Sequence, residues 1–497
     1  MNIVLLTPAR RFIANRAGLG YQMPLGLVLL GGPLVDDGHR VRLVDNDVLG
    51  WDDATLVREL AADPPDCVML GHTGSTAAHP TAMRTAAAIR RAFPRVRIVY
   101  GGVYPSYAAE TVLRENPSVD VVVRGEGEAT AVDLCRSGDL ADVRGITWRD
   151  GDEIRENPAR APIADLDRYR PGWELVDWNA YRLFGAGRSA GMQFSRGCPL
   201  RCTFCGQWGF WRRWRHRSPA NFVAELRTLV RTWGVGFVWL ADENFAADRD
   251  LTREVLERLD ADGLGISLNL NMTAADVVRD ADLLPLYKRA GVDNVVLGIE
   301  TLDDPTVEKI GKNNPRDVSR EACRRLRENG IVSFVNVIYG LEDETAATVA
   351  RTFRGLLDID PDVVNACYLT PHSWTPAGRL ARADQVVQAD QHLYTYRNQV
   401  LETPGLSPTA LFLGVKLTEA LFHLRPRGIA RLFTGGERFR RVHRAFMGAG
   451  IRVFLAELRE FLLETRFTAP GTLTRVPGFP SGRLSRPTPA DRLIGRK

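Results

Sequence analysis

Three cysteines stand close together in a chain that has only seven, and their spacing is the clearest sign of chemistry in the sequence. Cys198, Cys202 and Cys205 follow the short apolar-alternating run at residues 191–194. A strand that runs into a tight loop would turn all three sulfurs toward one point. Clustered thiolates bind soft metals, chiefly zinc and iron–sulfur clusters. Three ligands would leave one iron of a four-iron cluster open to bind substrate, as catalytic metal sites do.

Two simpler interpretations of these cysteines stay open. They could form a zinc site with His216 as fourth ligand, although structural zinc sites usually use two separated pairs of ligands. They could also be inert buried thiols, although their neighbours Arg196, Gly197 and Arg201 are typical of a half-polar loop. The spacing favours an iron–sulfur cluster over both.

The motif resembles the signature of radical S-adenosylmethionine (SAM) enzymes, which carry C-x3-C-x-aromatic-C. Phe204 stands in the aromatic position, which the resemblance places beside the adenine of SAM. The resemblance implies that Cys198, Cys202 and Cys205 hold a [4Fe–4S] cluster whose open iron chelates the amino and carboxylate groups of SAM. An electron from the cluster then cleaves SAM to give a 5′-deoxyadenosyl radical.

Length and composition are those of an ordinary globular protein. The 497 residues suffice for two or three domains, and the apolar (45%) and charged (25%) fractions are ordinary. The net charge is +5, with its basic excess after about residue 410, and we expect no nucleic-acid partner. We also expect no membrane span and no signal peptide, because no run of eighteen apolar residues and no basic leader are present. The odd number of cysteines argues for a reducing cytoplasm.

Residues 1–136 alternate apolar strands with helical patterns, which predicts a parallel α/β sheet of Rossmann or flavodoxin type. Strands are expected at residues 3–6, 41–44, 67–70, 96–100 and 119–123. Helices are expected at residues 25–36, 54–62, 80–92 and 108–115. Ligands of such sheets bind beyond the carboxyl ends of the strands, where glycines allow close approach. The candidate contacts there are Thr73, Gly74, Ser75, Gly101, Gly102, Val103, Glu126 and Gly127. A sheet without a ligand is the simpler alternative, because glycines also make turns.

These loops, in a chain with a radical SAM signature, resemble the cobalamin-binding domain of the B12-dependent class. Cobalamin-dependent mutases carry D-x-H-x-x-G, whose His ligates cobalt from below, but Asp47 stands in the His position of this chain. The resemblance therefore implies a cobalamin with no protein His beneath cobalt. His72 is a weaker candidate for the lower neighbour, since a His at a loop end is more often only a hydrogen-bonding group.

Residues 137–190 are expected to form a connector, with a hairpin at 145–154 that turns at Asp150-Gly151. From 191 to 384 the strand–helix alternation resumes. Strands are expected at 191–194, 237–240, 266–271, 294–297, 333–338 and 363–368, and helices at 219–233 and 249–261. Six such units predict a partial (β/α)6 barrel of TIM type, whose chemistry lies at the carboxyl ends of its strands.

The ends of the barrel strands carry the polar residues that the family resemblance implies for SAM binding. Asp242 and Glu243 replace the Gly-Gly-Glu with which many members hold the methionine amino group. Glu300, in a Gly-Ile-Glu element, and Asn336, on the fifth strand, resemble ribose or carboxylate contacts. Each carboxylate could instead be a solvated loop charge, but a position at a strand end favours binding.

Residues 385–466 are expected to form a helical domain, with helices at 387–401, 408–424, 428–433 and 451–464. Seven of its arginines could form a basic face, although such side chains are usually only solvated: Arg425, Arg427, Arg431, Arg438, Arg440, Arg441 and Arg444. Residues 467–497 are rich in Pro, Arg, Thr and Gly, which predicts a disordered tail.

Segments 205–212, 368–376 and 396–401 also resemble the family of anaerobic magnesium-protoporphyrin IX monomethyl ester oxidative cyclases. The likeness spans about residues 1–465 and departs after the first strand. There the cyclase has a His-, Asn- and Gly-rich loop, whereas this chain has Thr7-Pro8-Ala9-Arg10-Arg11-Phe12. The same architecture serves C-methyltransferases of natural-product and antibiotic pathways, in which the substrate radical takes a methyl group from methylcobalamin.

We expect C-methylation of an unactivated carbon, with oxidative cyclisation as the alternative and a cobalamin-binding regulator as a distant third. An arginine-rich composition, typical of GC-rich genomes, adds to the case for secondary metabolism. The implied partners are a small-molecule substrate, free or presented by a carrier protein, and an electron donor such as flavodoxin or ferredoxin.

Overall fold

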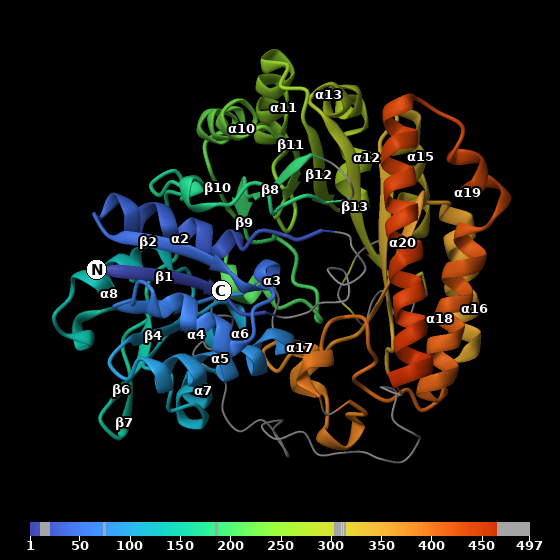
Figure 1. Cartoon of the computed structure of the whole chain (residues 1–497). Coiled ribbons are helices and arrows are strands. Elements are labelled where there is room, and N and C mark those ends of the chain that lie inside the picture. The colour runs from blue at the N-terminus through green and yellow to red at the C-terminus, as the bar shows by residue number, and fades with distance from the viewer. Residues whose placement is uncertain are drawn as a thin grey trace. The chain divides into compact units, whose positions relative to one another are not determined.

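The structure is a computed structural model that describes residues 1–9, 20–72, 76–183, 187–302, 310, 312, 315–388 and 390–464. The chain divides into two compact units. Unit 1 comprises Met1–Met192 with Arg215–Ser218, and unit 2 comprises Gln193–Trp214 with Pro219–Lys497. Figure 1 shows both units, coloured from blue at the N-terminus to red in the C-terminal helices. The tail predicted at 467–497 lies outside the described residues.

Unit 1 is built on a seven-stranded sheet with the order β2-β1-β3-β4-β5-β6-β7. Its strands are β1 (Asn2–Thr7), β2 (Arg40–Asp45), β3 (Cys67–Leu70), β4 (Arg97–Gly101), β5 (Val121–Val123), β6 (Ile146–Asp150) and β7 (Glu153–Glu156). The first five strands are parallel, in the order 2-1-3-4-5 of flavodoxin-like folds. The predicted hairpin is confirmed: β6 and β7 are antiparallel, pair Asp150 with Glu153, and extend the sheet.

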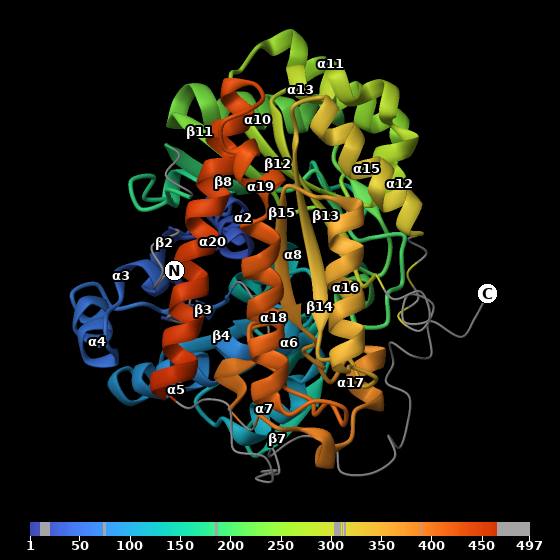
Figure 2. The ribbon, with the colours of Figure 1, turned by 90° about the vertical axis from the view of Figure 1, so that its right-hand side faces the viewer.

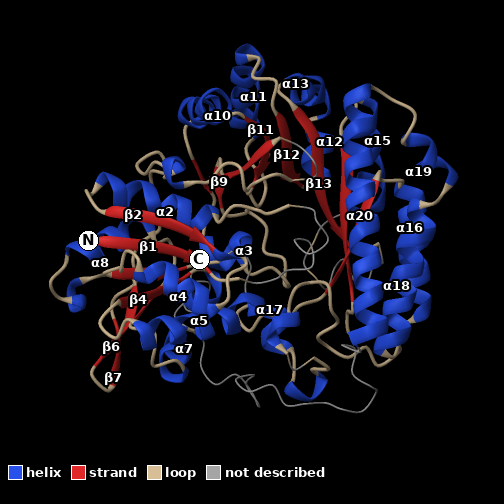
Figure 3. Ribbon diagram, viewed as in Figure 1, coloured by secondary structure: helices blue, strands red, loops and turns tan. Residues whose placement is uncertain are grey.

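Helices cover both faces of this sheet (Figure 3). They are α2 (Leu25–Asp36), α3 (Asn46–Leu49), α4 (Asp53–Ala61), α5 (His79–Ala92), α6 (Val103–Tyr107), α7 (Ala109–Glu115) and α8 (Glu128–Arg136). Val4 and Leu6 of β1 pack with α4, α5 and α7, while Ile3 and Leu5 pack with α2 and α8. Strands buried on both faces read as continuous apolar runs, which is why the sequence revealed them.

The second sheet has six strands in the order β15-β14-β13-β12-β11-β8. They are β8 (Arg188–Met192), β11 (Val235–Leu240), β12 (Ser267–Met272), β13 (Val292–Glu300), β14 (Val332–Tyr339) and β15 (Val363–Tyr368). Strands β11 to β15 are parallel. The helices between them are α10 (Pro219–Trp233), α11 (Arg249–Asp262), α12 (Ala274–Arg279), α13 (Leu284–Arg289), α15 (Arg316–Glu328) and α16 (Ala346–Ile359). This arrangement confirms the predicted partial barrel.

Short elements complete the loops: β9 (Ser195–Arg196), α9 (Gln207–Trp211), β10 (Arg215–His216) and α17 (Pro376–Leu380). The C-terminal helices are α18 (Pro408–His423), α19 (Pro426–Arg431) and α20 (Glu437–Glu464) (Figure 2). Within the described residues, no helix is both long enough and apolar enough to cross a membrane.

Two predicted C-terminal helices are corrected. Residues 387–401 form no α-helix, because Val386 pairs with Leu401 in an antiparallel bridge and Tyr396 takes a positive φ of 63°. The last helix begins at Glu437 and not at residue 451, so it includes Gly448 and Gly450 in spite of the low helix propensity of glycine.

Candidate functional site

The cysteine loop begins after β9 and requires glycine at its first turn. Gly197 has a φ of +94°, and a Cβ there would lie 2.6 Å from the carbonyl oxygen of Arg213. The backbone N–H of Thr203 donates to the carbonyl of Ile310 at 3.1 Å, and the Thr203 carbonyl accepts from the N–H of Ala377 at 3.0 Å. The middle of the loop is therefore tied to the segments that follow β13 and β15.

The three thiols lie close enough to influence one another electrostatically. Burial raises the pKa of Cys198 to about 11 and that of Cys205 to about 12, and the neighbouring thiols add to both shifts. Burial also raises the pKa of Cys202. None of the three cysteines forms a disulfide within the described residues, and Phe204 between them is half-buried. Because only thiolates bind metal, loading this site must release protons.

Three thiols in one loop are a donor set that fits an iron–sulfur cluster. Among the residues that the structure describes, no three or more His, Cys, Asp or Glu side chains are arranged to hold one metal ion. A single ion draws its ligands into one coordination sphere, whereas a cubane cluster holds thiolates at separate corners. His216, the fourth ligand in the zinc alternative, has its Nδ1 2.9 Å from the Arg217 carbonyl.

Asp242 follows β11 and is fully engaged with the residues that lead into the loop. Its carboxylate accepts from the N–H of Phe194 at 3.0 Å, from the N–H of Ser195 at 2.5 Å and from the Ser195 hydroxyl at 2.6 Å. Burial raises its pKa to about 6, against the opposing effect of these donors. The geometry thus makes Asp242 a positioning residue for the loop, and its predicted contact with SAM stays a prediction.

Glu243, the next residue, carries a carboxyl group that interacts electrostatically with the cysteines. Its charge acts on the Cys198 and Cys205 thiols. Burial, with the charge of Asp242, raises the pKa of Glu243 to about 7, while the Trp211 indole acts in the opposite direction. A carboxyl with a pKa near neutrality ionises readily when a cation is placed beside it, which suits recognition of an ammonium group.

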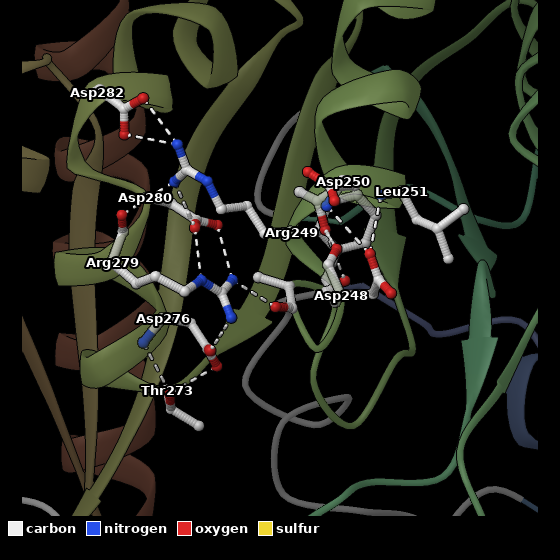
Figure 4. A network of polar contacts seen from close by, with 12 residues as sticks. Asp248, Arg249, Asp250, Leu251, Thr273, Asp276, Arg279, Asp280 and Asp282 are labelled. Atoms are coloured by element: carbon white, nitrogen blue, oxygen red, sulfur yellow. Dashed lines mark hydrogen bonds and ion pairs between the residues drawn. The ribbon is translucent and has the colours of Figure 1, made fainter.

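A polar network holds the loop that carries these two carboxyls (Figure 4). Arg279, at the end of α12, donates to the backbone carbonyl of Ala246 at 2.7 Å. Arg279 and Arg249 both bind the carboxylate of Asp280, at 2.7 Å and 3.0 Å, and Asp280 is completely buried. The loops after β11 and β12 are therefore locked together.

Glu300 ends β13 in a strained backbone conformation. Its φ is +68°, a region that residues other than glycine rarely adopt. Its carboxylate accepts from Lys312 Nζ at 2.8 Å, and each side chain is only 11% exposed. Gly298 leaves room for this pair, because a Cβ there would lie 2.4 Å from Glu300 Oε1 and 2.5 Å from Lys312 Nζ. Strain of this kind persists only where the surroundings enforce it and is common at functional sites.

Lys312 connects this pair to the cysteine loop. Burial lowers the pKa of Lys312, but the charges of Glu300, Cys202 and Cys198 outweigh that effect, and the pKa is raised. Lys312 in turn lowers the pKa of the Cys198 and Cys202 thiols. Sequence reasoning found Glu300 and missed Lys312, because Lys312 follows in a segment without periodicity.

Asn336 belongs to the same polar face. It lies opposite Gly298 in the β13–β14 register, and its side-chain carbonyl accepts from Asn365 Nδ2 at 2.8 Å. Asn365 Nδ2 also lies 3.3 Å from Cys367 Sγ, and the charge of Glu300 acts on Cys367. The structure thus brings Glu300 and Asn336 onto neighbouring strands. Asn365 and Cys367 went unnoticed in the sequence, although their spacing of two on a strand places them on one face.

Aromatic side chains follow β15. The rings of His372 and Trp374 stack at 4.7 Å, and His372 Nε2 lies 2.8 Å from the Tyr396 hydroxyl. Burial lowers the pKa of His372 to about 4, so its imidazole is neutral. A Cβ at Gly206 would lie 2.2 Å from Trp374 Nε1. The end of the cysteine loop therefore packs directly against this aromatic group.

A cavity of about 300 Å³ opens within unit 2. It is lined by residues that follow β13, β14 and β15, among them Thr301, Leu341 and Leu369. Ala377, whose N–H binds the cysteine loop, also lines it. Its charged residues are Glu342, Asp343, Glu344, Arg382 and Glu402. A cavity of this size is at the small end of ligand sites.

In unit 1 the predicted ligand loops lie at the carboxyl ends of β4 and β5. Gly102 has a φ of +122° and Gly125 a φ of +83°, and a Cβ at either would meet open space. Gly101 ends β4, and Val103 begins α6. Open backbone at strand ends suits a large ligand. Thr73, Gly74 and Ser75 lie outside the described residues.

Glu126 and Gly127 are engaged within unit 1. The Glu126 carboxylate binds Arg215 at 2.8 Å and accepts from the N–H of Ile163 at 2.7 Å. A Cβ at Gly127 would lie 2.9 Å from the side chain of Leu30. Both residues thus have structural roles, and their contact with a ligand stays a prediction.

Asp47, which stands in the His position of the mutase motif, and His72, the weaker candidate, both make hydrogen bonds within unit 1. The Asp45 carboxylate accepts from the Asp47 N–H at 3.2 Å and from the Tyr181 hydroxyl at 2.8 Å. His72 Nε2 lies 2.8 Å from the Tyr100 hydroxyl, which lies 3.4 Å from Nδ1 of another histidine, His79. Sequence reasoning missed Tyr100 and His79, because a strand end and a helix start meet only in the fold.

The chain matches two families and several known proteins. Residues 192–356 match the radical SAM superfamily, and residues 13–135 match the B12 binding domain. The chain is 39% identical over 486 residues to the anaerobic magnesium-protoporphyrin IX monomethyl ester cyclase of Synechocystis sp., which covers 97% of each chain. It is 27% identical to the hopanoid C-3 methylase of Methylococcus capsulatus, over 80% of this chain and 76% of that one.

A solved structure shares the fold at low identity. The radical SAM methyltransferase TsrM from Kitasatospora setae, with tryptophan substrate and a SAM analogue bound, is 18% identical to this chain. The two superpose with a TM-score of 0.67, over 94% of this chain and 99% of the other.

Proposed function

Because the chain belongs to the radical SAM enzymes that carry a B12-binding domain, we propose that it is a C-methyltransferase acting on an unactivated carbon of a small natural-product intermediate, such as an antibiotic precursor. It is a cobalamin-dependent radical SAM enzyme whose cofactors are a [4Fe–4S] cluster, SAM and cobalamin. When bound, these cofactors supply a 5′-deoxyadenosyl radical and a transferable methyl group.

The residues of unit 2 would bind and orient the reactants. Cys198, Cys202 and Cys205 would hold the cluster as thiolates. Glu243, with its pKa near neutrality, would ionise beside the amino group of SAM. Glu300 and Asn336, on adjacent strands, offer an acceptor and an amide for the ribose or carboxylate. The loops are preorganised by Asp242 and the Arg279–Asp280 network, so the geometry need not be assembled during turnover.

The observation that carries methylation is the character of the cavity in unit 2. At about 300 Å³, with Glu342, Asp343, Glu402 and Arg382 in its lining, it suits a small polar substrate. A flat tetrapyrrole is larger and mostly apolar. The departure from the cyclase pattern at Thr7-Pro8-Ala9 and the relatedness to a named methylase add support.

Oxidative cyclisation is the second candidate, and a specific observation favours it. The sequence identity to the cyclase is 39% over 97% of both chains, which is higher than the 27% identity to the methylase. A cyclase would use the same radical, and no methyl group would leave SAM.

The two candidates can be separated before the substrate is known. The enzyme is reconstituted anaerobically with cobalamin, a reductant and SAM that carries a deuterated methyl group. A methyltransferase should move the label to cobalamin and release one S-adenosylhomocysteine per bound cobalamin. Replacing the three cysteines together by Ala should abolish the cluster and with it the formation of deoxyadenosine. Deoxyadenosine without S-adenosylhomocysteine and without labelled cobalamin would overturn methylation in favour of cyclisation.

A further inference from the structure

Helix α18 and the residue that caps its C-terminus carry a row of leucines that no other part of the described chain covers. Leu413, Leu417, Leu421 and Leu424 are between 49% and 67% exposed. Spacings of three and four residues place them on one side of the helix. The opposite side, with Leu411, Val415 and Phe422, is buried. Exposed leucines are usually scattered singly, so a continuous row indicates an interaction surface.

Helix α20 extends this row into a wider face. Ile451, Leu455 and Leu462 are between 56% and 69% exposed. Helices α18 and α20 lie side by side in both views (Figures 1 and 2). Phe412 stacks on Phe461 at 4.3 Å.

The contacts between the two helices place their exposed apolar rows at the same level along the helix axes. Lys416 binds Glu457, one turn further along from Phe412 and Phe461. The two helices are therefore antiparallel. Each step toward the C-terminus of α18 is matched by a step toward the N-terminus of α20. Leu417 consequently lies level with Ala456, and Leu421 with Arg452. We call the exposed side of both helices the α18–α20 face.

The charge on this face is positive. Arg441, Arg452 and Arg459 are exposed, and intervals of eleven and seven residues align them along α20 beside the apolar row. Within the described residues, none of these three side chains makes an ion pair or a hydrogen bond. Among the exposed side chains of α18 and of residues 437–462, the only carboxylate is Glu437, in the first turn of α20.

The segment that follows α20 in the sequence also carries a net positive charge. Residues 465–497 contain seven arginines and lysines and one aspartate. This segment would therefore be repelled by the α18–α20 face. A second copy docked by two-fold symmetry would likewise set arginines against arginines. Neither residues 465–497 nor a second copy of the chain therefore complements the positive charge of the α18–α20 face.

We propose that the α18–α20 face adsorbs to the surface of a membrane that carries anionic lipids. Leu413 to Leu424 span about 16 Å at 1.5 Å per residue, which suits shallow insertion of a helix pair lying in the interface. The arginines flank the apolar row, as in interfacial amphipathic helices, and would meet lipid phosphates. An acidic protein partner would satisfy the charge but has no need of a flat row of aliphatic side chains.

The proposal is tested by flotation of the full-length holoenzyme with vesicles. One set contains phosphatidylcholine alone, and the other contains phosphatidylcholine with phosphatidylglycerol. The enzyme should float with the anionic vesicles, and added salt should weaken binding. Arg452→Gln with Arg459→Gln should weaken it about 30-fold, since each cationic side chain at an anionic surface contributes about 1 kcal/mol. Leu417→Gln with Leu421→Gln should weaken it at least about tenfold.

The controls separate this face from other sources of binding. Leu380→Gln removes a leucine that is 81% exposed on α17, outside this face, and should leave flotation unchanged. Every variant keeps residues 465–497, so equal flotation of all variants would assign binding to that segment and overturn the proposal. Absence of flotation would overturn it as well. A dimer in ultracentrifugation that the leucine variants abolish would identify a second copy as the occupant, against the proposal.

Discussion

Glu300 and Lys312 form a buried ion pair beside the cysteines, and each residue is expected to affect the cluster in the opposite direction. Reduction adds negative charge to the cluster. A nearby ammonium stabilises the reduced state, and a nearby carboxylate destabilises it. The positive φ of Glu300 shows that the fold maintains this arrangement against a backbone cost.

Lys312→Met should therefore lower the reduction potential of the cluster, and Glu300→Gln should raise it. An unscreened charge at this depth is worth roughly 1–2 kcal/mol, or about 40–90 mV for one electron. Redox titration followed by electron paramagnetic resonance measures both shifts. Lys288→Met is the control, because Lys288 pairs with Asp293 at the opposite end of β13. Shifts of the same sign in both variants would contradict the assignment.

Glu243 makes stability depend on pH. Its pKa in the folded protein is about 7, raised by burial from 4.5. A raised pKa means that the folded state holds the proton more tightly, so stability is lost as pH rises from about 4.5 through 7. Glu243→Gln carries no proton and should escape this loss. The free energy of unfolding of the variant, relative to that of the wild type, should therefore rise by roughly 1–3 kcal/mol between pH 5 and pH 8.

Urea unfolding of the metal-free protein at the two pH values measures this gain. Glu257→Gln, which removes an exposed carboxylate of α11, is the control. If the difference between Glu243→Gln and the wild type stayed constant with pH, the carboxyl would not be buried as described.

At the scale of elements, the loops after β11 and β12 are held by the charged network of α11 and α12 (Figure 4). Its centre is Asp280, which has no exposed surface and binds Arg249, Arg279 and the Tyr287 hydroxyl. Asp282 binds the same Arg249 from an exposed position. Asp280 and Asp282 therefore bind the same arginine and differ in burial, so that substitutions of the two can be compared directly.

Asp280→Ala should destabilise unit 2 by about 1–3 kcal/mol, because it removes a fully buried carboxylate and leaves the buried Tyr287 hydroxyl without its partner. Asp282→Ala should cost less than about 1 kcal/mol, as exposed ion pairs do. Denaturant titration measures both. Because Arg279 also holds Ala246, partial loosening in Asp280→Asn should weaken SAM binding, whereas Asp282→Asn should not. Equal costs for the two Ala variants would show that the network does not hold the loop.

At the scale of the whole molecule, the two cofactor sites belong to two units. Unit 1 contains the B12-binding match and unit 2 contains the cysteines. The units should therefore lose their cofactors independently. Enzyme freed of cobalamin should still cleave SAM to deoxyadenosine but should deliver no methyl group. The Cys198, Cys202 and Cys205 to Ala variant should retain cobalamin and lose deoxyadenosine formation.

Cofactor analysis and chromatography of the products test this double dissociation. In the variant that lacks the three cysteines, iron should fall from about four per chain to none, with cobalamin content unchanged. Loss of cobalamin together with the cluster would mean that the two sites fold as one.

The sequence alone determined the features that depend on neighbouring residues. The spacing of Cys198, Cys202 and Cys205 lies within one loop, so the family and its cofactors could be predicted and are confirmed. Strand and helix periodicity is also local, and it predicted both sheets and placed Glu243, Glu300 and Asn336 at or near strand ends.

Only the tertiary structure decided the partners of these side chains. Asp242 turned out to bind the start of the cysteine loop, and Lys312 to join Glu300 to the cysteines. Residues 387–401 were read as a helix, but a bridge from Val386 to Leu401 overrides local propensity. In each case the decisive contact joins residues that are distant in the sequence or opposed to local preference. Local periodicity shows which side of an element is buried, and the folded chain alone shows what it is buried against.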